Sequence, residues 1–376
     1  MPQPALLVLA DGTSFAGTAI GYSDTVTGEV VFNTSMSGYQ EILTDPSYAR
    51  QIITFTYPPI GHVGCNEHHT EAPRSWAAGI VIRDLSLAMS NWRSEQSLDD
   101  FLRQQKITGI ADIDTRALTH HLRETGSQNG CITPYVDQVQ QAQQMAEKCE
   151  SLIGQNLAQQ VTTPQQYSWQ QGSIAAGHLP SSSSTSQSAH VVVYDFGVKR
   201  SMLRLLVDRS CRVTVVPANT PASDVLALQP DGIVLSNGPG DPAACDTAIA
   251  NIKQLLTHKI PLLAICLGCQ LVTLALGGGT QKMKFGHHGA NHPIIDLTTR
   301  QVFITSQNHG FMVDEAQLSS EWVITHRSLF DNTIQGLRHH QWPILAFQGH
   351  PEAHPGPHDT LSIWDDFIDL ITTANP

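Results

Sequence analysis

Four short apolar runs in the second half of the chain constrain its fold more than any other feature. They lie at residues 191–194, 212–216, 232–235 and 261–265, and the stretches between them are long enough to form helices. Such runs, rich in Val, Ile and Leu, are typical of strands buried on both faces of a parallel sheet, with helices in the crossovers. The sequence therefore predicts a doubly wound, mostly parallel α/β domain, in which ligands bind beyond the carboxyl ends of the strands.

The first part of the chain follows a different pattern. Residues 29–32 and 51–55 read as strands between Gly and Pro turns, which predicts a smaller mixed domain rich in β-strands. A helix is predicted over residues 114–122, with Asp112 or Asp114 as its N-terminal cap. The periodicity places four residues on one face of this helix: Ala117, Leu118, His121 and Leu122.

A Gln-rich and Ser-rich segment separates the two patterns and has little apolar surface to bury. We therefore predict an N-terminal domain over 1–150, a linker over 151–189 and a second domain over 190–376. Residues 136–152 are still compatible with a helix, so the flexible portion is expected to be the later part of this segment.

The composition excludes several classes of protein. Hydrophobic residues make up 41% and charged residues 14%, as in a folded enzyme, and the formal net charge is -12 without a basic cluster, which argues against nucleic acid as a partner. The apolar run at 5–10 is too short for a secretion signal or a membrane span, so we expect no membrane association and a cytoplasmic location. The seven scattered cysteines are expected to be reduced.

Cys266 follows the fourth apolar run directly and precedes a helical segment. A nucleophile at a tight turn from strand to helix stands clear of the backbone, and the amides of the helix N-terminus can stabilise anions there. Gly268 permits the sharp turn. Three alternatives stay open: a buried core cysteine, a redox dithiol with Cys269, and half of a zinc site.

Two further motifs follow buried strands. His350 and Glu352 are two residues apart after the run 342–346, so the carboxylate can orient the imidazole and stabilise its protonated form. The loop 236–242 contains Gly238 and Gly240 around a proline, which lets backbone amides approach a ligand closely. Taken alone, either motif is also compatible with an ordinary exposed turn.

Together these motifs resemble the three signatures of class I, or triad-type, glutamine amidotransferases. Within that class, segments 284–293 and 306–311 resemble the small subunit of carbamoyl phosphate synthetase. Segments 32–41, 44–48 and 112–116 resemble the N-terminal domain of the same family, which other amidotransferases lack. The resemblance covers nearly the whole chain apart from the Gln-rich and Ser-rich segment.

The resemblance implies roles for individual residues. Cys266 would be the nucleophile, His350 the general base and acid, and Glu352 its orienting partner, while Leu267 and Gly240 would supply oxyanion amides. The residues implied in glutamine binding are Ser47, Gly238, Gly240, Leu267, Gln270, Asn308, Gly310 and Phe311. Ser47 would act from the first domain.

The resemblance also implies a reaction and a partner. L-glutamine would be hydrolysed and its ammonia delivered to a large synthetase subunit that makes carbamoyl phosphate for arginine and pyrimidine biosynthesis. This chain has no recognised phosphate loop, so we expect no cofactor here, and ATP and Mg would be used by the large subunit. Three alternatives are a glutaminase for anthranilate or guanylate synthesis, a catalytically silent regulatory subunit, and a stand-alone hydrolase of γ-glutamyl compounds.

One position departs from the family pattern, which commonly has Cys-Leu-Gly-His-Gln where this chain has Cys269. The C-x-x-C spacing motivates the hypothesis that oxidants join Cys266 and Cys269 in a disulfide. We expect no metal site in this chain. The closest histidine cluster, His287, His288 and His292, fits no standard zinc spacing and is expected to be structural.

Overall fold

The computed structural model describes residues 3–173 and 189–374, which form two compact units. The first unit comprises residues 1–153 together with 284–289, and the second comprises 154–283 together with 290–376. The short segment 284–289 therefore packs with the first unit, although the sequence assigned it to the second domain. The reason is local pairing, because the Ser127 N–H donates to the Lys284 carbonyl at 2.9 Å.

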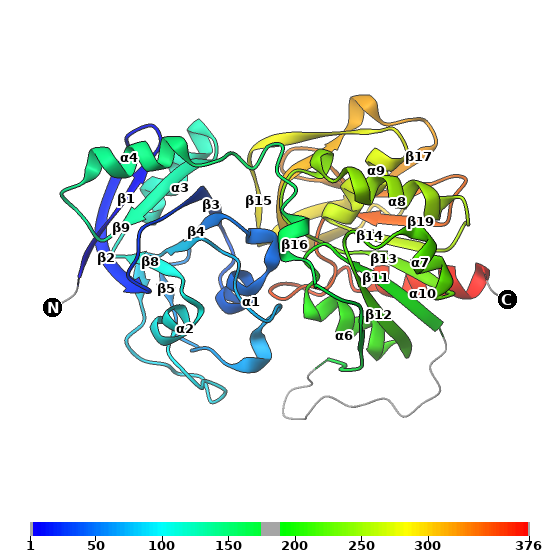
Figure 1. Ribbon diagram of the computed structural model, residues 1–376, viewed down its shortest axis with the longest axis horizontal. Helices are drawn as coiled ribbons and strands as arrows, with labels where there is room; N and C mark the ends of the chain where they lie inside the picture. The colour runs from blue at the N-terminus through cyan, green and yellow to red at the C-terminus, as the bar shows by residue number, and fades with distance from the viewer. Residues whose placement is uncertain (1–2, 174–188, 375–376) are drawn as a thin grey trace. The chain divides into compact units, whose positions relative to one another are not determined.

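The first unit is built on a closed barrel with strand order β1-β2-β8-β6-β4-β3-β9 (Figure 1). Its strands are β1 (Pro4–Leu9), β2 (Ser14–Gly21), β3 (Val26–Asn33), β4 (Gln51–Phe55), β6 (Gly79–Val81), β8 (Thr108–Ala111) and β9 (Gln128–Thr133). Strands β3, β4, β6 and β8 run parallel to one another, and the other neighbours in the barrel are antiparallel. The predicted strands at 29–32 and 51–55 are confirmed as parts of β3 and β4.

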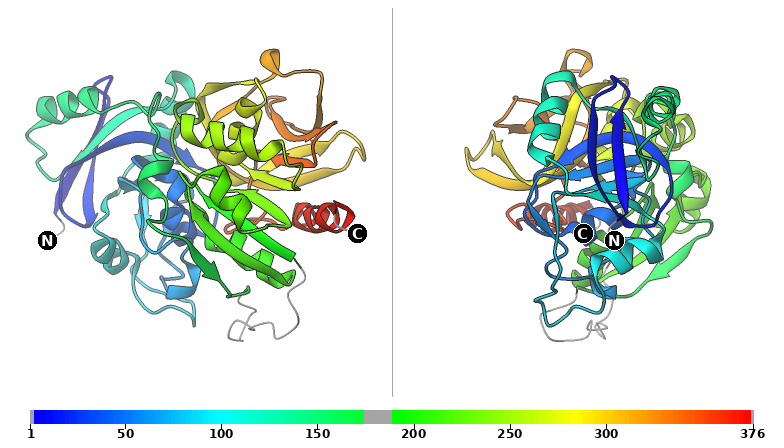
Figure 2. Two further views of the ribbon diagram at one scale, coloured as in Figure 1. Left: turned by 45° about the vertical axis from the view of Figure 1, so that its right-hand side comes forward. Right: turned by 90° about the vertical axis from the view of Figure 1, so that its left-hand side faces the viewer.

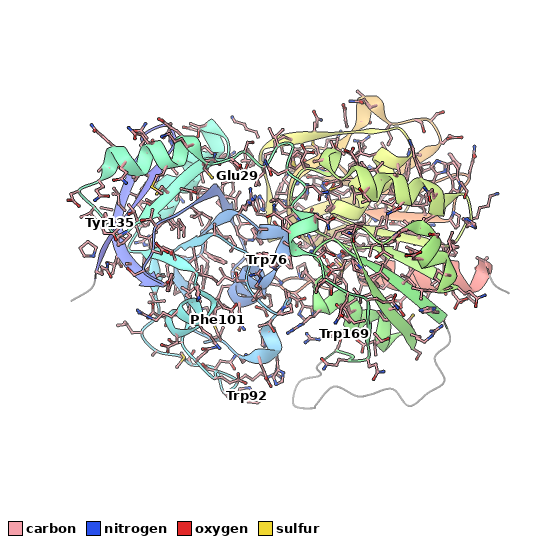
Figure 3. All side chains as sticks on the ribbon, viewed as in Figure 1. Glu29, Trp76, Trp92, Phe101, Tyr135 and Trp169 are labelled. Atoms are coloured by element: carbon pink, nitrogen blue, oxygen red, sulfur yellow. The ribbon has the colours of Figure 1, made fainter. Side chains whose placement is uncertain are left out.

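Helices and short elements complete the first unit: α1 (Tyr39–Thr44), η1 (Pro46–Tyr48), β5 (Pro59–Ile60), η2 (Glu67–His69), β7 (Asp84–Leu85), α2 (Leu98–Gln105), α3 (Thr115–Thr125) and α4 (Val139–Lys148). Phe101 of α2 is buried with the barrel residues Ile53 and Ile80 in one apolar cluster, whereas Trp92 on a loop is 80% exposed (Figure 3). Helix α4 lies within the segment that the sequence left compatible with a helix.

Helix α3 confirms one part of its prediction and corrects another. Asp114 caps it, because its carboxylate accepts the Ala117 N–H at 2.9 Å. Leu118 and Leu122 are buried as expected, but Ala117 is exposed and His121 only half-buried. The buried stripe is completed by Thr115 instead. At 3.6 residues per turn, Ala117 lies about 100° away from Leu118, outside this narrow stripe.

The second unit contains a sheet with strand order β10-β12-β11-β13-β14-β19-β18-β17-β15-β16. Its strands are β10 (Tyr167–Trp169), β11 (Ala189–Asp195), β12 (Cys211–Pro217), β13 (Gly232–Leu235), β14 (Leu262–Ile265), β15 (Gly279–Asp296), β16 (Val302–Asp314), β17 (Trp322–Ser328), β18 (Ile334–His339) and β19 (Ile344–Phe347). The run β12-β11-β13-β14-β19 is parallel, and β10, β17 and β18 pair antiparallel with their neighbours. All four predicted apolar segments form strands in the parallel part of this sheet.

Helices cover both faces of this sheet (Figure 2). They are α5 (Ala158–Val161), α6 (Arg200–Asp208), α7 (Ala222–Ala227), α8 (Asp246–Leu256), α9 (Leu267–Ala275) and α10 (Ser362–Ala374), with short turns η3 (Pro242–Ala244) and η4 (Glu315–Gln317). One apolar cluster packs α7, α8 and α9 against the sheet, and a second packs α6 and α10 against it. The predicted doubly wound α/β class is confirmed.

The predicted linker over 151–189 differs from the structure in its first part. Residues 158–161 form α5, and residues 167–169 form β10, which pairs with β12 at the edge of the sheet. Tyr167 and Trp169 pack against the α6 and α10 cluster, which explains why a polar segment is held in place here. Most of the Ser-rich portion, 174–188, lies outside the described residues. No helix among the described residues has the length and apolarity needed to cross a bilayer.

Candidate active site

Cys266 stands at the elbow between β14 and α9. The backbone φ of Cys266 is 53°, in the left-handed region, where a residue with a side chain is strained. Such backbone strain is common at functional turns. A Cβ on Gly268 would lie 2.3 Å from the Leu235 carbonyl oxygen, so only glycine allows the helix to begin this close to β13. The Cys266 thiol is 2% exposed and donates to the Asn308 carbonyl oxygen at 3.5 Å.

The structure brings His350 and Glu352 together directly after β19. The imidazole Nδ1 lies 2.6 Å from Glu352 Oε1, and both side chains are almost completely buried. The His350 N–H donates to the Ser306 carbonyl at 2.9 Å, which fixes the backbone of the pair. Its Nε2 is buried, and the Cys266 side chain acts as a second hydrogen-bond partner of the ring. The nitrogen opposite Glu352 is therefore placed for proton transfer.

The charges around His350 favour its protonated form. Burial of the ring lowers the pKa of His350, but the charges of Glu352 and Cys266 outweigh burial and raise this pKa above its ordinary value. For Glu352, burial raises the pKa of the carboxyl, but Lys199 and His350 outweigh it and hold the pKa well below its usual range. Together, Cys266, His350 and Glu352 can place a thiolate, an imidazolium and a carboxylate next to one another.

Lys199 is a member of this site that the sequence analysis missed. Its ammonium lies 2.9 Å from Glu352 Oε1 and donates to the Ala353 carbonyl oxygen at 2.7 Å, and its side chain is 2% exposed. A buried charge is tolerated only when it is paired and hydrogen-bonded, as here. Lys199 follows β11, so the rule that ligands bind beyond the carboxyl ends of strands could have singled it out.

Leu267 and Gly240 were predicted to supply oxyanion amides, and this role stays a prediction. Leu267 opens α9, where the first N–H groups have no partner within the helix. Gly240 has a φ of 93°, and a Cβ there would lie 2.5 Å from the Gln155 carbonyl oxygen. A Cβ on Gly238 would lie 2.2 Å from the Phe196 carbonyl oxygen. Both glycines are therefore required by close approach of the backbone, and not merely by a turn.

The remaining predicted glutamine-binding residues of the second unit lie on or beside β16. The Asn308 carbonyl oxygen accepts a hydrogen bond from the Cys266 thiol, and Gly310 and Phe311 follow Asn308 on the same strand. Gln270 donates to the Phe311 carbonyl at 2.8 Å and to Gln348 Oε1 at 3.1 Å, so its amide NH₂ group holds the wall of the site together. Ser47 belongs to the first unit, in η1, and its role toward glutamine stays a prediction.

Cys269 is fully buried on the α9 side of the sheet, and burial raises the pKa of its thiol. Cys266 belongs to the other apolar cluster, with Ile265 and Phe347. Because a protonated, fully buried thiol is a poor nucleophile, the structure argues against the disulfide hypothesis. Mild oxidation with hydrogen peroxide is expected to give sulfenic or sulfinic acid on Cys266 and to leave Cys269 reduced. Peptide mass mapping that finds a disulfide between the two would contradict this expectation.

Replacing Lys199 with methionine is expected to move the acid limb of the kcat/KM profile for glutamine hydrolysis to higher pH. Lys199 lowers the pKa of Glu352, so its loss raises that pKa. A carboxyl whose pKa is lowered in the folded protein stabilises the fold at pH values above its unfolded pKa. That stabilisation is lost as the pH falls through the folded pKa, so in Lys199→Met the loss begins at higher pH. We also expect the free energy of unfolding at neutral pH to fall by about 3 kcal/mol.

The matched control for this change is Lys199→Arg, which keeps the positive charge beside Glu352. It is expected to return the acid limb most of the way toward the wild-type position. The measurements are a pH series of initial rates and urea unfolding at neutral and acidic pH. An acid limb that stays in place in Lys199→Met would show that Lys199 supports the fold without acting on the titration of Glu352.

The described residues contain one group of side chains close enough to share a metal ion: Glu67, His68 and Glu95. These groups lie in the first unit, and both carboxylates are exposed. Exposed acidic clusters of this kind are common without a metal. His287, His288 and His292 are buried and do not form such a group among the described residues.

Comparison with known proteins matches both parts of the chain. Residues 7–132 match the family described as carbamoyl-phosphate synthase small chain, CPSase domain, and residues 192–370 match glutamine amidotransferase class-I. Proteins called carbamoyl phosphate synthase small chain are similar over nearly the full length. That of Pectobacterium atrosepticum is 57% identical over 99% of this chain and 98% of its own. Those of Vibrio cholerae (56%, covering 99% of each chain) and Escherichia coli K12 (55%, covering 99% of this chain and 98% of its own) are similar as well.

These relatives match this chain over nearly their whole length, and the elbow cysteine lies within the matched amidotransferase region of this chain. The chain therefore belongs to the carbamoyl phosphate synthase small chain family.

Proposed function

We propose that this chain is the glutaminase subunit of a glutamine-hydrolysing carbamoyl phosphate synthase. The proposal rests on four buried side chains at the carboxyl ends of parallel strands: Cys266, His350, Glu352 and Lys199. This arrangement suits acyl transfer from a neutral amide, because it supplies an activated nucleophile and a proton donor side by side in a buried site.

In the proposed reaction, the Cys266 thiolate attacks the side-chain amide carbon of glutamine. The developing oxyanion is stabilised by the N–H groups of Leu267 and Gly240. His350 donates its proton from Nε2 to the leaving nitrogen, and ammonia departs, leaving a γ-glutamyl thioester. A water molecule that loses its proton to His350 then attacks the thioester, and glutamate and the free thiol result.

The family membership supports a large synthetase chain as the partner, in the cytoplasm. Ammonia released to water would be protonated, so its delivery to the large chain requires that the two proteins associate. ATP would be consumed on the large chain, which would also bind the Mg that this chemistry requires. Ser47 of the first unit and Gly238, Gln270, Asn308, Gly310 and Phe311 of the second would position glutamine.

The proposal is tested by adding the purified chain to the purified large synthetase subunit. With glutamine as nitrogen donor, carbamoyl phosphate synthesis is expected only when this chain is present, whereas with ammonium chloride it is expected with or without it. A silent regulatory subunit would give no glutamate in either assay. A stand-alone hydrolase would release glutamate at full rate and never confer glutamine-driven synthesis, and a glutaminase for another synthetase would not confer it either.

A further inference from the structure

A cavity of about 660 Å³ in the first unit is lined by none of the residues assigned to glutamine hydrolysis. Thr56 follows β4 directly, and Asp114 lies just after β8, so the cavity is at the carboxyl ends of parallel barrel strands. Its other wall is α3, through Arg116, Thr119 and Arg123. A recess of this size at the ends of parallel strands is a typical place for binding.

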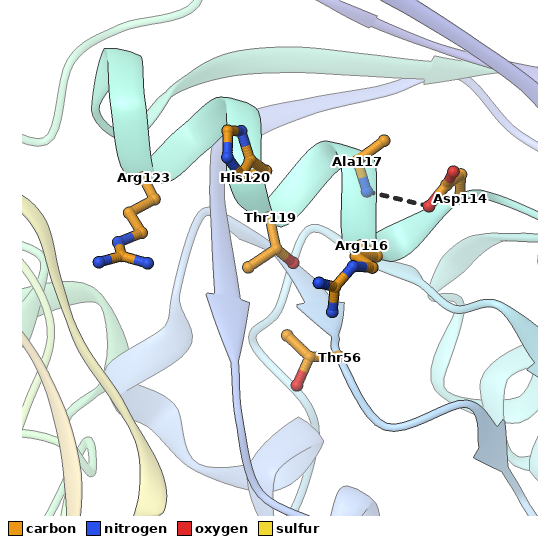
Figure 4. Close-up of a pocket in the computed structure, with 7 residues that line it drawn as sticks. All are labelled: Thr56, Asp114, Arg116, Ala117, Thr119, His120 and Arg123. Atoms are coloured by element: carbon orange, nitrogen blue, oxygen red, sulfur yellow. Dashed lines mark hydrogen bonds between the residues drawn. The ribbon is translucent and has the colours of Figure 1, made fainter.

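The barrel core fixes the direction in which α3 presents these arginines. Leu118 and Leu122 are completely buried among barrel residues, so the helix cannot rotate about its axis without exposing them. Seven residues make nearly two full turns, and Arg116 and Arg123 therefore project from the same side of the helix. Figure 4 shows both guanidinium groups on this side, with Thr119 between them. We call Arg116, Thr119 and Arg123 the arginine face.

No ion pair within the described part of the chain neutralises the arginine face. Neither Arg116 nor Arg123 forms an ion pair with any residue that the structure describes, although the chain has more carboxylates than cations. Among the described residues that line the cavity, Asp114 supplies the one carboxylate, and one of its oxygens already caps the helix. His120, which also lines the cavity, has the exposed Glu124 as a neighbour at 3.6 Å.

We propose that the arginine face docks an acidic segment of the large synthetase subunit, an inference that rests on the proposed function. Each guanidinium can bind a carboxylate through two parallel hydrogen bonds. Seven residues place the Cα atoms of the two arginines about 10 Å apart along the helix axis. A protein segment with two carboxylates can engage both guanidinium groups at once, and arginine is enriched among the residues that anchor protein interfaces.

The test is the double variant Arg116→Glu with Arg123→Glu in the full-length chain. Its dissociation constant for the purified large subunit, measured by calorimetry, is expected to be at least about tenfold higher than that of the wild type, because two attractive pairs become repulsive. Raising the salt concentration is expected to weaken the wild-type complex more than the variant complex. Glutamine hydrolysis by the isolated chain and its thermal unfolding are expected to stay unchanged, because both side chains are exposed and unpaired.

The matched control is Arg212→Glu on β12, an exposed arginine that forms no ion pair among the described residues and lines no part of this cavity. Wild-type affinity in the double variant, or equal weakening by the control, overturns the proposal. The proposal is also overturned if the double variant assembles normally while inorganic phosphate or pyrophosphate binds the wild type and not the variant. That result would assign the cavity to a small anion. These results leave the proposed function intact. A wild-type chain that does not bind the large subunit would overturn both.

Discussion

Replacing Cys266 with alanine is expected to lower glutamine-driven carbamoyl phosphate synthesis by at least about 10³-fold while ammonia-driven synthesis continues at the wild-type rate. The sulfur is the atom that forms the thioester, and alanine offers no nucleophile in its place at the elbow. Losing one buried sulfur leaves the backbone of the elbow in place, so assembly with the large subunit is expected to persist. Both activities are measured in the reconstituted complex.

The matched control is Cys211→Ala on β12, another fully buried, free cysteine in the same unit. It is expected to keep both activities, which separates the chemistry of Cys266 from the loss of a buried thiol as such. Equal loss of both activities in Cys266→Ala would contradict the assignment of a glutaminase site. Retention of both would contradict the role of this residue as the nucleophile.

Replacing His350 with asparagine is expected to lower kcat/KM for glutamine hydrolysis by about 10² to 10⁴-fold. Asparagine can still donate toward Glu352, but it offers no group that exchanges protons near neutral pH. Without His350, neither the departing ammonia nor the attacking water has a proton partner. The pH dependence of the residual activity is expected to lose the contribution of the raised His350 pKa. Initial rates of glutamate release across a pH series measure both effects.

His190→Asn supplies the matched control. His190 is buried in β11, where its ring lies 2.9 Å from Thr214 Oγ1, and burial lowers its pKa. Its loss removes a buried imidazole of the same size without touching Cys266 or Glu352. We expect its activity to stay near the wild-type value even if its thermal stability falls. Similar losses of activity in the two variants would mean that His350 supports the fold and does not transfer protons.

The strand pattern and the catalytic elbow could be predicted from local sequence. A strand buried on both faces must be apolar throughout, so the four runs of the second domain are visible without knowledge of their neighbours. Cys266, Gly268 and Gly240 stand at positions where backbone geometry restricts the residue type, and such restrictions leave a local signature. Periodicity was less informative on α3, where Ala117 was assigned to the buried face and is exposed.

By itself, the sequence determined the class of fold, the family and the positions of Cys266, His350 and Glu352. Only the tertiary structure decided that Lys199, more than 150 positions from Glu352, completes the buried charge pair, and that Cys269 faces a different apolar cluster from Cys266. It also decided that Arg116 and Arg123 share one unpaired face of α3. Local patterns record what the backbone requires of each residue, whereas the partner of a charge depends on contacts that form only when distant strands pack together.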